Sequence, residues 1–280
     1  MTSRPSTIIR ASSSPFDWRL GQLWRYRDLI LLFVWRDFVA VYKQTILGPA
    51  WHLLRPLTTT GIFTVVFAGV AKLSTDGIPP FLFYLSGTLA WTYFASCLDQ
   101  TARTFVGHAH LLGKVYFHRL VIPLSLVLSN LVAFAIQFAI FVTALVAFKI
   151  GGAQIHLTAW AFASPLLLVM LAGYGLGGGI IVCALTTRFR DLAHLVTFGV
   201  QLLMYLTPVI YPTSFVPIQY RWVVNLNPLT PLLEAFRLGF LGEGTVTVGA
   251  VASSLAVLVV LLVVGLSLFT RAERTFMDTV

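Results

Sequence analysis

The sequence predicts an all-α integral membrane protein. It has six transmembrane helices, an N-terminal interfacial amphipathic helix, and short re-entrant outer helices between spans five and six. Of the 280 residues, 58% are hydrophobic and only 10% are charged, and the mean hydropathy is +0.86. A soluble domain of this length needs more polar surface. The net charge of +9 does not indicate nucleic-acid binding, because the basic residues punctuate apolar runs instead of gathering on one polar face.

Runs of roughly 20 mostly apolar residues mark the membrane spans. Five such runs cover residues 55–73, 81–106, 119–148, 158–186 and 246–269. A sixth, 194–211, is shorter and ends in TPVIYP, where Pro208 and Pro212 are expected to break or kink a helix. We therefore expect a six-span transmembrane domain over residues 49–270.

The distribution of positive charge predicts the orientation. Six spans place both termini on one side, together with the loop after span two and the TTRFRDL loop. That side carries fifteen of the nineteen Lys and Arg residues, and cytoplasmic loops retain positive charge. We therefore expect both termini in the cytoplasm, with residues 1–22 as a flexible N-terminus and residues 271–280 as a tail.

The segment 23–48 contains an apolar run too short to span a membrane. Arg25, Arg36 and Lys43 are separated by 11 and 7 residues, so they share one helix face while Trp and Phe side chains occupy others. This pattern is typical of an amphipathic helix that lies in the membrane interface. A cytosolic helix packed against a partner protein is the alternative.

The segment 212–245, after the sixth apolar run, is too apolar for a solvated loop. Its Asn-Pro and Thr-Pro steps divide it into pieces too short to cross a membrane. Backbone that enters a membrane without spanning it must be shielded by protein or line a cavity. The segment therefore predicts one or two short re-entrant or interfacial helices on the outer face.

The stretch GHAHLLGKVYFHR, residues 107–119, looks at first like a phosphate-binding loop. Gly107 and Gly113 enclose five residues instead of four, and Lys114 is followed by Val115 instead of Ser or Thr. His108 and His110 would point about 200° apart on a helix, a poor arrangement for one metal ion. The remaining interpretation is an exposed basic loop with apolar members, which indicates contact with a partner protein.

Polar residues inside the spans have mostly structural explanations. Asp99 and Arg103 stand four apart and can pair on one helix face. Gly173 with Gly177, and Gly175 with Gly179, have the spacing that lets helices approach closely. A further set either bonds between helices or faces a passage: Thr58 to Thr60, Asn130, Gln137 and Gln201. No catalytic constellation is evident, so transport without chemistry of its own is favoured.

Several ordered stretches resemble one family. They are RDFVAVYKQTILGPAWHLLRPL (36–57), FYLSGTLAWTYF (83–94), LLGKVYFHRLVIPLS (111–125), TTRFRDL (186–192), YLTPVIYPTSFVP (205–217) and LNPLTPLLEAFR (226–237). These resemble the signatures of ABC-2 type permeases, more narrowly the membrane subunits of exporters for lipid-linked O-antigen, teichoic acid and capsular polysaccharides. The chain departs from the family at Arg55, where Gln is more common, and at His118, where Pro is more common.

The resemblance implies a homodimer bound to two copies of a cytoplasmic ABC ATPase. ATP and magnesium would lie in that partner subunit, with no cofactor in this chain. The loop 107–119 would contact the ATPase through His108, His110, Leu111, Lys114, Tyr116, Phe117 and Arg119. A second cytoplasmic contact would use Arg188, Arg190 and Asp191, and the N-terminal helix would also touch the ATPase.

The resemblance also implies a channel at the dimer interface, lined by spans one and five and closed by an outer gate. Candidate channel residues are Phe63, Phe67 and Tyr205, because aromatic planes stack on sugar rings. Candidate gate residues in the outer gate region 212–245 and beside it are Pro208, Tyr211 and Pro228.

The expected function is export of lipid-linked polysaccharide across a bacterial inner membrane. An ABC-2 exporter of drugs or small lipids is the first alternative. An ion-coupled secondary carrier is a second, and the lack of acidic residues at the middle of the spans disfavours it.

Overall fold

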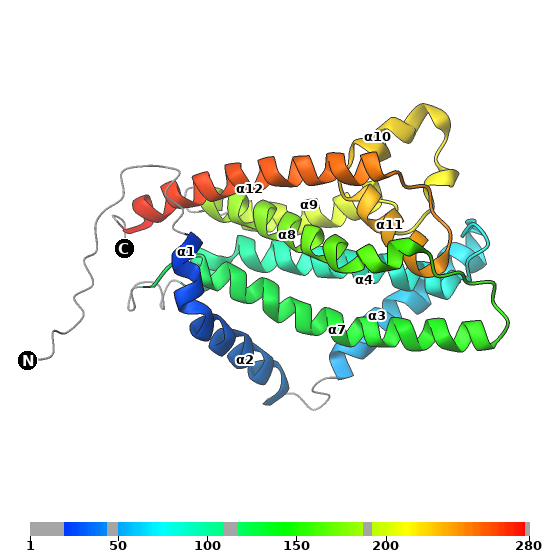
Figure 1. The fold of residues 1–280 in the computed structure, drawn as a ribbon, viewed down its shortest axis with the longest axis horizontal. Coiled ribbons are helices and arrows are strands. Elements are labelled where there is room, and N and C mark those ends of the chain that lie inside the picture. The colour runs from blue at the N-terminus through cyan, green and yellow to red at the C-terminus, as the bar shows by residue number, and fades with distance from the viewer. Residues whose placement is uncertain (1–19, 44–49, 109–116, 187–191, 278–280) are drawn as a thin grey trace, which may run out of the picture.

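The computed structural model describes residues 20–43, 50–108, 117–186 and 192–277. Within these ranges the regular structure is helical (Figure 1). The first elements are α1 (Leu20–Leu23), η1 (Trp24–Tyr26), α2 (Arg27–Lys43), and α3 (Ala50–Phe63) with its π-helical continuation η2 (Thr64–Val70). Next come α4 (Pro80–Ala102), α5 (Thr104–Gly107), α7 (Val121–Ile150), η3 (Ala159–Ala163), α8 (Ser164–Thr186) and α9 (Leu192–Leu206). The last are η4 (Thr213–Phe215), η5 (Ile218–Tyr220), α10 (Arg221–Leu226), α11 (Thr230–Leu241) and α12 (Val248–Met277).

Among the described residues, five helical segments are long and apolar enough to cross a membrane. They are Leu53–Val70, Pro80–Ala102, Val121–Ile150, Ala159–Thr186 and Val248–Ala272, and Leu195–Leu206 in α9 is a shorter apolar helix. This confirms the predicted five long spans and shorter sixth. The chain is an all-α, multi-pass membrane protein.

The helices are arranged around α4. In its span 72% of residues are buried, against 11% in the first span. α4 packs on α3, α7 and α8, and α12 covers the other side of α8. The first span therefore lies at the edge of the bundle. α9 also exposes a large apolar face, which includes Leu195, Phe198 and Leu202.

Glycines on α8 allow this close packing. A Cβ atom at Gly175 would lie 2.5 Å from Cys97 Cβ on α4, and one at Gly179 would lie 2.5 Å from Thr101 Cβ. On the opposite face, a Cβ at Gly173 would meet Leu258 of α12 at 3.0 Å. The packing role predicted from the glycine spacing is therefore confirmed on both faces.

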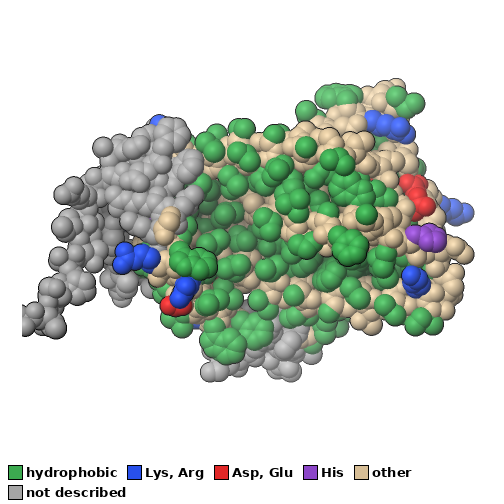
Figure 2. Space-filling view, in the orientation of Figure 1, with side chains coloured by type: hydrophobic (Ala, Val, Ile, Leu, Met, Phe, Trp, Pro, Cys, Tyr) green, Lys and Arg blue, Asp and Glu red, His purple; other side chains and the backbone are tan. Residues whose placement is uncertain are grey.

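The surface has the pattern of a membrane-embedded bundle. Figure 2 shows hydrophobic side chains across the middle of the molecule, with the charged side chains toward its two ends. One end gathers α1, the start of α7 and the end of α12, and the other gathers α10, α11 and the loop after α7 (Figure 1). The element order thus alternates between two ends, as successive spans require.

The segment after α9 forms the predicted short helices. α9 ends at Leu206, two residues before Pro208, and Asn227 to Leu229 separate α10 from α11. The Thr-Pro step does not divide the segment further. It opens α11, because proline is tolerated in the first turn of a helix. Most of α11 is buried against α4, α8 and η3.

Candidate functional site

At the end that carries α1, helix α2 packs against the first part of α7. Its Ile30 and Phe33 are buried in an apolar cluster with Phe105, Leu120 and other residues of this end. The Phe33 ring meets the Phe117 ring edge-on, with centroids 6.0 Å apart. The last residues of the 107–119 loop are therefore joined to α2 by direct aromatic contact.

This contact corrects one expectation. Phe117 and Arg119 were expected on an exposed loop, but their side chains are only 6% and 5% exposed. Phe117 is buried because the apolar face of α2 covers it within the same molecule. His108 is partly exposed. The other predicted coupling residues, His110, Leu111, Lys114 and Tyr116, and the second set, Arg188, Arg190 and Asp191, lie outside the described residues.

The outward face of α2 and η1 is both apolar and basic. Trp24, Leu31 and Trp35 are exposed on one side, opposite the buried Ile30 and Phe33. Arg25 and Arg36 are also exposed, and Arg36 pairs with its neighbour Asp37 at 2.7 Å. The side chain of Lys43 lies outside the described part. An exposed apolar stripe flanked by arginines is the arrangement expected of an interfacial helix.

The predicted pair of Asp99 and Arg103 is present on α4, at 3.2 Å. It reaches a second helix, because Arg103 donates to the Thr197 hydroxyl at 2.9 Å and that hydroxyl donates to Asp99 at 3.1 Å. The pair therefore joins the C-terminal end of α4 to α9, which is more than a bond within one helix.

The predicted channel residues divide into two groups. Phe63 and Phe67 are half-buried. Their ring centroids lie 5.4 Å apart, and each centroid lies 6.2 Å from that of the Tyr84 ring on α4. Tyr205 is exposed, and it lies on a bare face of α9 together with Leu195, Phe198 and Leu202. The described ring contacts do not bring Tyr205 together with the two phenylalanines. Their role in a channel stays a prediction.

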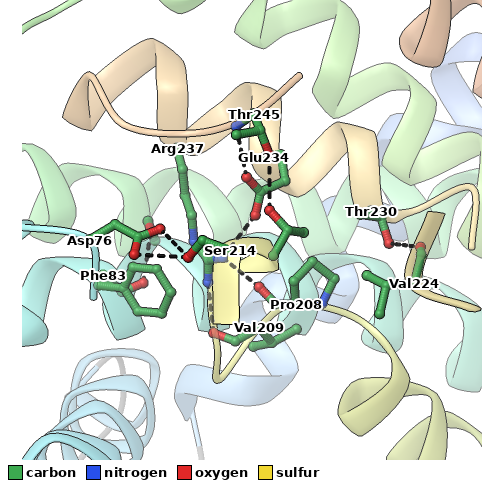
Figure 3. A network of polar contacts seen from close by, with 12 residues as sticks. Asp76, Phe83, Pro208, Val209, Ser214, Val224, Thr230, Glu234, Arg237 and Thr245 are labelled. Atoms are coloured by element: carbon green, nitrogen blue, oxygen red, sulfur yellow. Dashed lines mark hydrogen bonds and ion pairs between the residues drawn. The ribbon is translucent and has the colours of Figure 1, made fainter. Parts of the chain in front are cut away.

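The opposite end contains a buried charged network that the sequence analysis missed (Figure 3). Arg237 and Glu234 of α11 are only 2% and 4% exposed. They form an ion pair in which Arg237 Nη1 lies 3.6 Å from Glu234 Oε1. Arg237 donates to the carbonyls of Pro208 and Val209, just after α9. Glu234 accepts from the Thr245 amide at 3.2 Å. One helix thus holds the chain after α9 and the chain before α12.

The guanidinium remains charged in this setting. Burial lowers the pKa of Arg237 to about 10, and the neighbouring Glu234 carboxylate opposes that shift. A buried pair of this kind is costly to break, because each partner would otherwise be an uncompensated charge. The sequence did carry a signal for it: Glu234 stands three residues before Arg237, the spacing of a helical ion pair.

Of the three predicted gate residues, Pro208 belongs to this network, and Tyr211 and Pro228 make hydrogen bonds of their own. The Pro208 carbonyl accepts from Arg237, and the Tyr211 hydroxyl donates to the Tyr205 carbonyl at 3.0 Å. The Pro228 carbonyl accepts from the Ser254 hydroxyl of α12 at 2.7 Å. Together these bonds connect the ends of α9, α10 and α12. Whether they open stays a prediction.

This fold is that of a multi-pass, all-α membrane protein. The chain belongs to the ABC-2 type transporter family, whose sequence profile matches residues 28–241. Within that family it is similar to the O-antigen export system permease protein RfbA of Klebsiella pneumoniae, with 28% identity over 93% of this chain and 97% of the relative.

Two further relatives show how far the similarity extends. The RfbA protein of Myxococcus xanthus is 26% identical over 92% of this chain and 98% of its own. The inner membrane transport permease YadH of Escherichia coli K12 is 22% identical over 81% of this chain and 86% of its own. The O-antigen export permeases are thus matched from end to end.

Proposed function

We propose that this chain is the transmembrane permease subunit of an ATP-driven ABC exporter that moves lipid-linked polysaccharide of the O-antigen type. The observation that carries the proposal is the match to permeases named for O-antigen export over nearly the whole of both chains. The membrane is the bacterial inner membrane, with both termini in the cytoplasm.

The bare faces of the bundle support assembly as a homodimer. Ile62, Val65 and Val70 of the first span are exposed, and so is the face of α9 that includes Phe198 and Tyr205. Both elements expose apolar side chains, whereas α4 is enclosed. Two copies that face each other across these surfaces would build a passage between them.

The energy source is a separate ATPase, present in two copies, which binds ATP and magnesium. Its contacts are the 107–119 loop and the segment with Arg188, Arg190 and Asp191. The Phe33–Phe117 contact supports a route by which ATP hydrolysis in the partner moves the helices of this chain. A shift of the loop would displace α2 and α7 together, because α2 contacts Phe117 of the loop and packs on α7.

Loss of the encoding gene tests the substrate class. The proposal predicts that the surface glycan disappears, that lipid-linked glycan accumulates on the cytoplasmic side, and that a plasmid-borne copy reverses both effects. If the surface glycan is intact, the chain is instead an exporter of drugs or small lipids. The similarity to YadH, which is named only as a transport permease, is compatible with that alternative.

A further inference from the structure

Two cavities adjoin each other between α2, α3, α4 and α7. Their volumes are about 220 Å³ and about 170 Å³, and they share Gln100, Asn130 and Ala133 as lining residues. We call the two together the inner groove. Each part is smaller than the roughly 300–1,000 Å³ typical of sites that enclose a whole drug-sized ligand. The inner groove therefore suits a head group whose remainder lies outside.

The walls of the inner groove carry several polar side chains among apolar ones. Thr92, Ser96 and Gln100 follow one face of α4 at intervals of four residues and line the groove. Asn130 of α7 exchanges two hydrogen bonds with Gln100, at 3.0 and 3.2 Å. The second N–H of Asn130 donates to the Leu126 carbonyl at 2.9 Å. The two amides therefore hold each other in place, and Gln100 keeps one N–H for a ligand while Asn130 can still accept a hydrogen bond through its oxygen.

Two polar groups in the inner groove lack partners. Gln137 is only 8% exposed, and none of the hydrogen bonds among the described residues involves its side chain. The Ser129 hydroxyl is shielded from solvent and also has no hydrogen-bond partner there. Buried polar groups are nearly always satisfied by protein or water. Only Ser129 of the two is shielded from solvent; the Gln137 amide is open to the cavity, so its hydrogen-bonding groups are available to a ligand in exchange for water.

The charge in the inner groove comes from Arg55. It lies within the first span, lines the second cavity beside Trp51, and forms no ion pair with the described acidic residues. Asp37, at the other end of the groove, is already paired with Arg36. Arg55 stands near the start of that span and is exposed beside the groove. A cation there without a carboxylate partner is a candidate for binding an anion, because the guanidinium fork matches phosphate oxygens.

We propose that the inner groove binds the phosphate-and-sugar head of the lipid-linked substrate before it enters the passage. Arg55 takes the phosphate, and Gln137, Gln100 and Asn130 take sugar hydroxyls. Trp51, half exposed on the same face of α3 as Arg55, offers an aromatic plane to the sugar ring. The inference rests on the proposed function and adds to it a site for the substrate's head.

Binding of defined lipids to the full-length protein in phosphatidylcholine nanodiscs tests the site. The probe is a polyprenyl diphosphate that carries one sugar, with phosphatidylglycerol, the free polyprenyl alcohol and inorganic phosphate as competitors. The proposal predicts saturable binding of the probe and weak competition by the other three. Equal competition by phosphatidylglycerol would show a general anionic-lipid site and overturn the proposal.

Three variants locate the binding. Arg55→Gln is expected to weaken binding of the probe about tenfold or more, because a charged hydrogen bond is lost. Arg27→Gln removes the same charge from an exposed position outside the groove and is expected to change affinity less than twofold. Gln137→Leu is expected to weaken binding while raising the unfolding temperature, since it replaces a buried amide that has no partner. If Arg55→Gln and Gln137→Leu both bind normally, the site is refuted.

The gene-loss experiment separates this inference from the proposed function. If gene loss abolishes surface glycan while the groove variants bind and export normally, only the inner groove is refuted. If the surface glycan is intact after gene loss, the proposed function itself is wrong.

Discussion

The guanidinium carbon of Arg237 lies 3.9 Å from the centroid of the Phe83 ring. In this position α11 reaches across α4, and the same guanidinium donates to the backbone after α9. A Cβ at Gly87 of α4 would come within 2.6 Å of it. One buried side chain therefore fixes three separate segments at the end of the bundle that carries α10 and α11.

Replacement of Arg237 by Met is expected to destabilise the protein by about 3 to 5 kcal/mol, because Glu234 remains as an unpaired buried charge. Thermal unfolding in detergent measures the effect. Lys149→Met, at an exposed position, is the control, and the double change Glu234→Gln with Arg237→Met is expected to recover part of the loss. Equal melting of Arg237→Met and the unchanged protein would contradict a structural role.

Gly179→Ala is expected to cost about 1 to 3 kcal/mol, because the new Cβ would lie 2.5 Å from Thr101 Cβ and 2.9 Å from the Leu98 carbonyl. Gly199→Ala in α9 is a matched control, since nothing lies within 4 Å of its Cβ position and alanine favours a helix. Unfolding temperatures of the two variants provide the comparison. If both variants unfold alike, α8 does not approach α4 as closely as described.

Phe117→Ala is expected to destabilise the isolated permease by about 3 to 5 kcal/mol, since it empties a core position against Phe33. The measurement uses the permease without its ATPase, so that loss of a partner contact cannot produce the result. Phe33→Ala should give a similar loss from the other side of the contact. Unchanged stability together with lost ATPase binding would show that Phe117 faces the partner after all.

The exposed stripe of α2 is expected to lie in lipid. A polarity-sensitive fluorophore on Leu31→Cys should report an apolar environment in liposomes, and one on Arg36→Cys, about 140° away round the helix, a wetter one. The native Cys97 and Cys183 are buried, so labelling is confined to the new thiol. Matching polar signals at both positions would place the helix in water.

Local pattern predicted much of the fold. Hydropathy located the spans, the two pairs of glycines indicated close helix contacts, and four-residue spacing predicted the bond between Asp99 and Arg103. Each of these properties depends on neighbours within a few helical turns. They can therefore be found without knowledge of how the helices pack.

Contacts between distant segments were beyond the sequence pattern. Phe117 was expected to be exposed because its loop is basic, but α2, more than seventy residues earlier, covers it. Nothing in the local pattern shows that Arg237 binds the chain near Pro208, almost thirty residues earlier. The inner groove likewise requires Arg55, Gln100 and Gln137 to meet from three helices.

Transport by the purified complex tests the central claim most directly. The permease and its ATPase are reconstituted in liposomes with the ATPase facing outward, and lipid-linked glycan is added to the outer leaflet. The account predicts that ATP moves the glycan into the lumen, where an added glycosidase cannot cleave it, and that a catalytically inactive ATPase abolishes the movement. The account is contradicted if the glycan stays accessible to the glycosidase while ATP is hydrolysed and drugs or small lipids are transported.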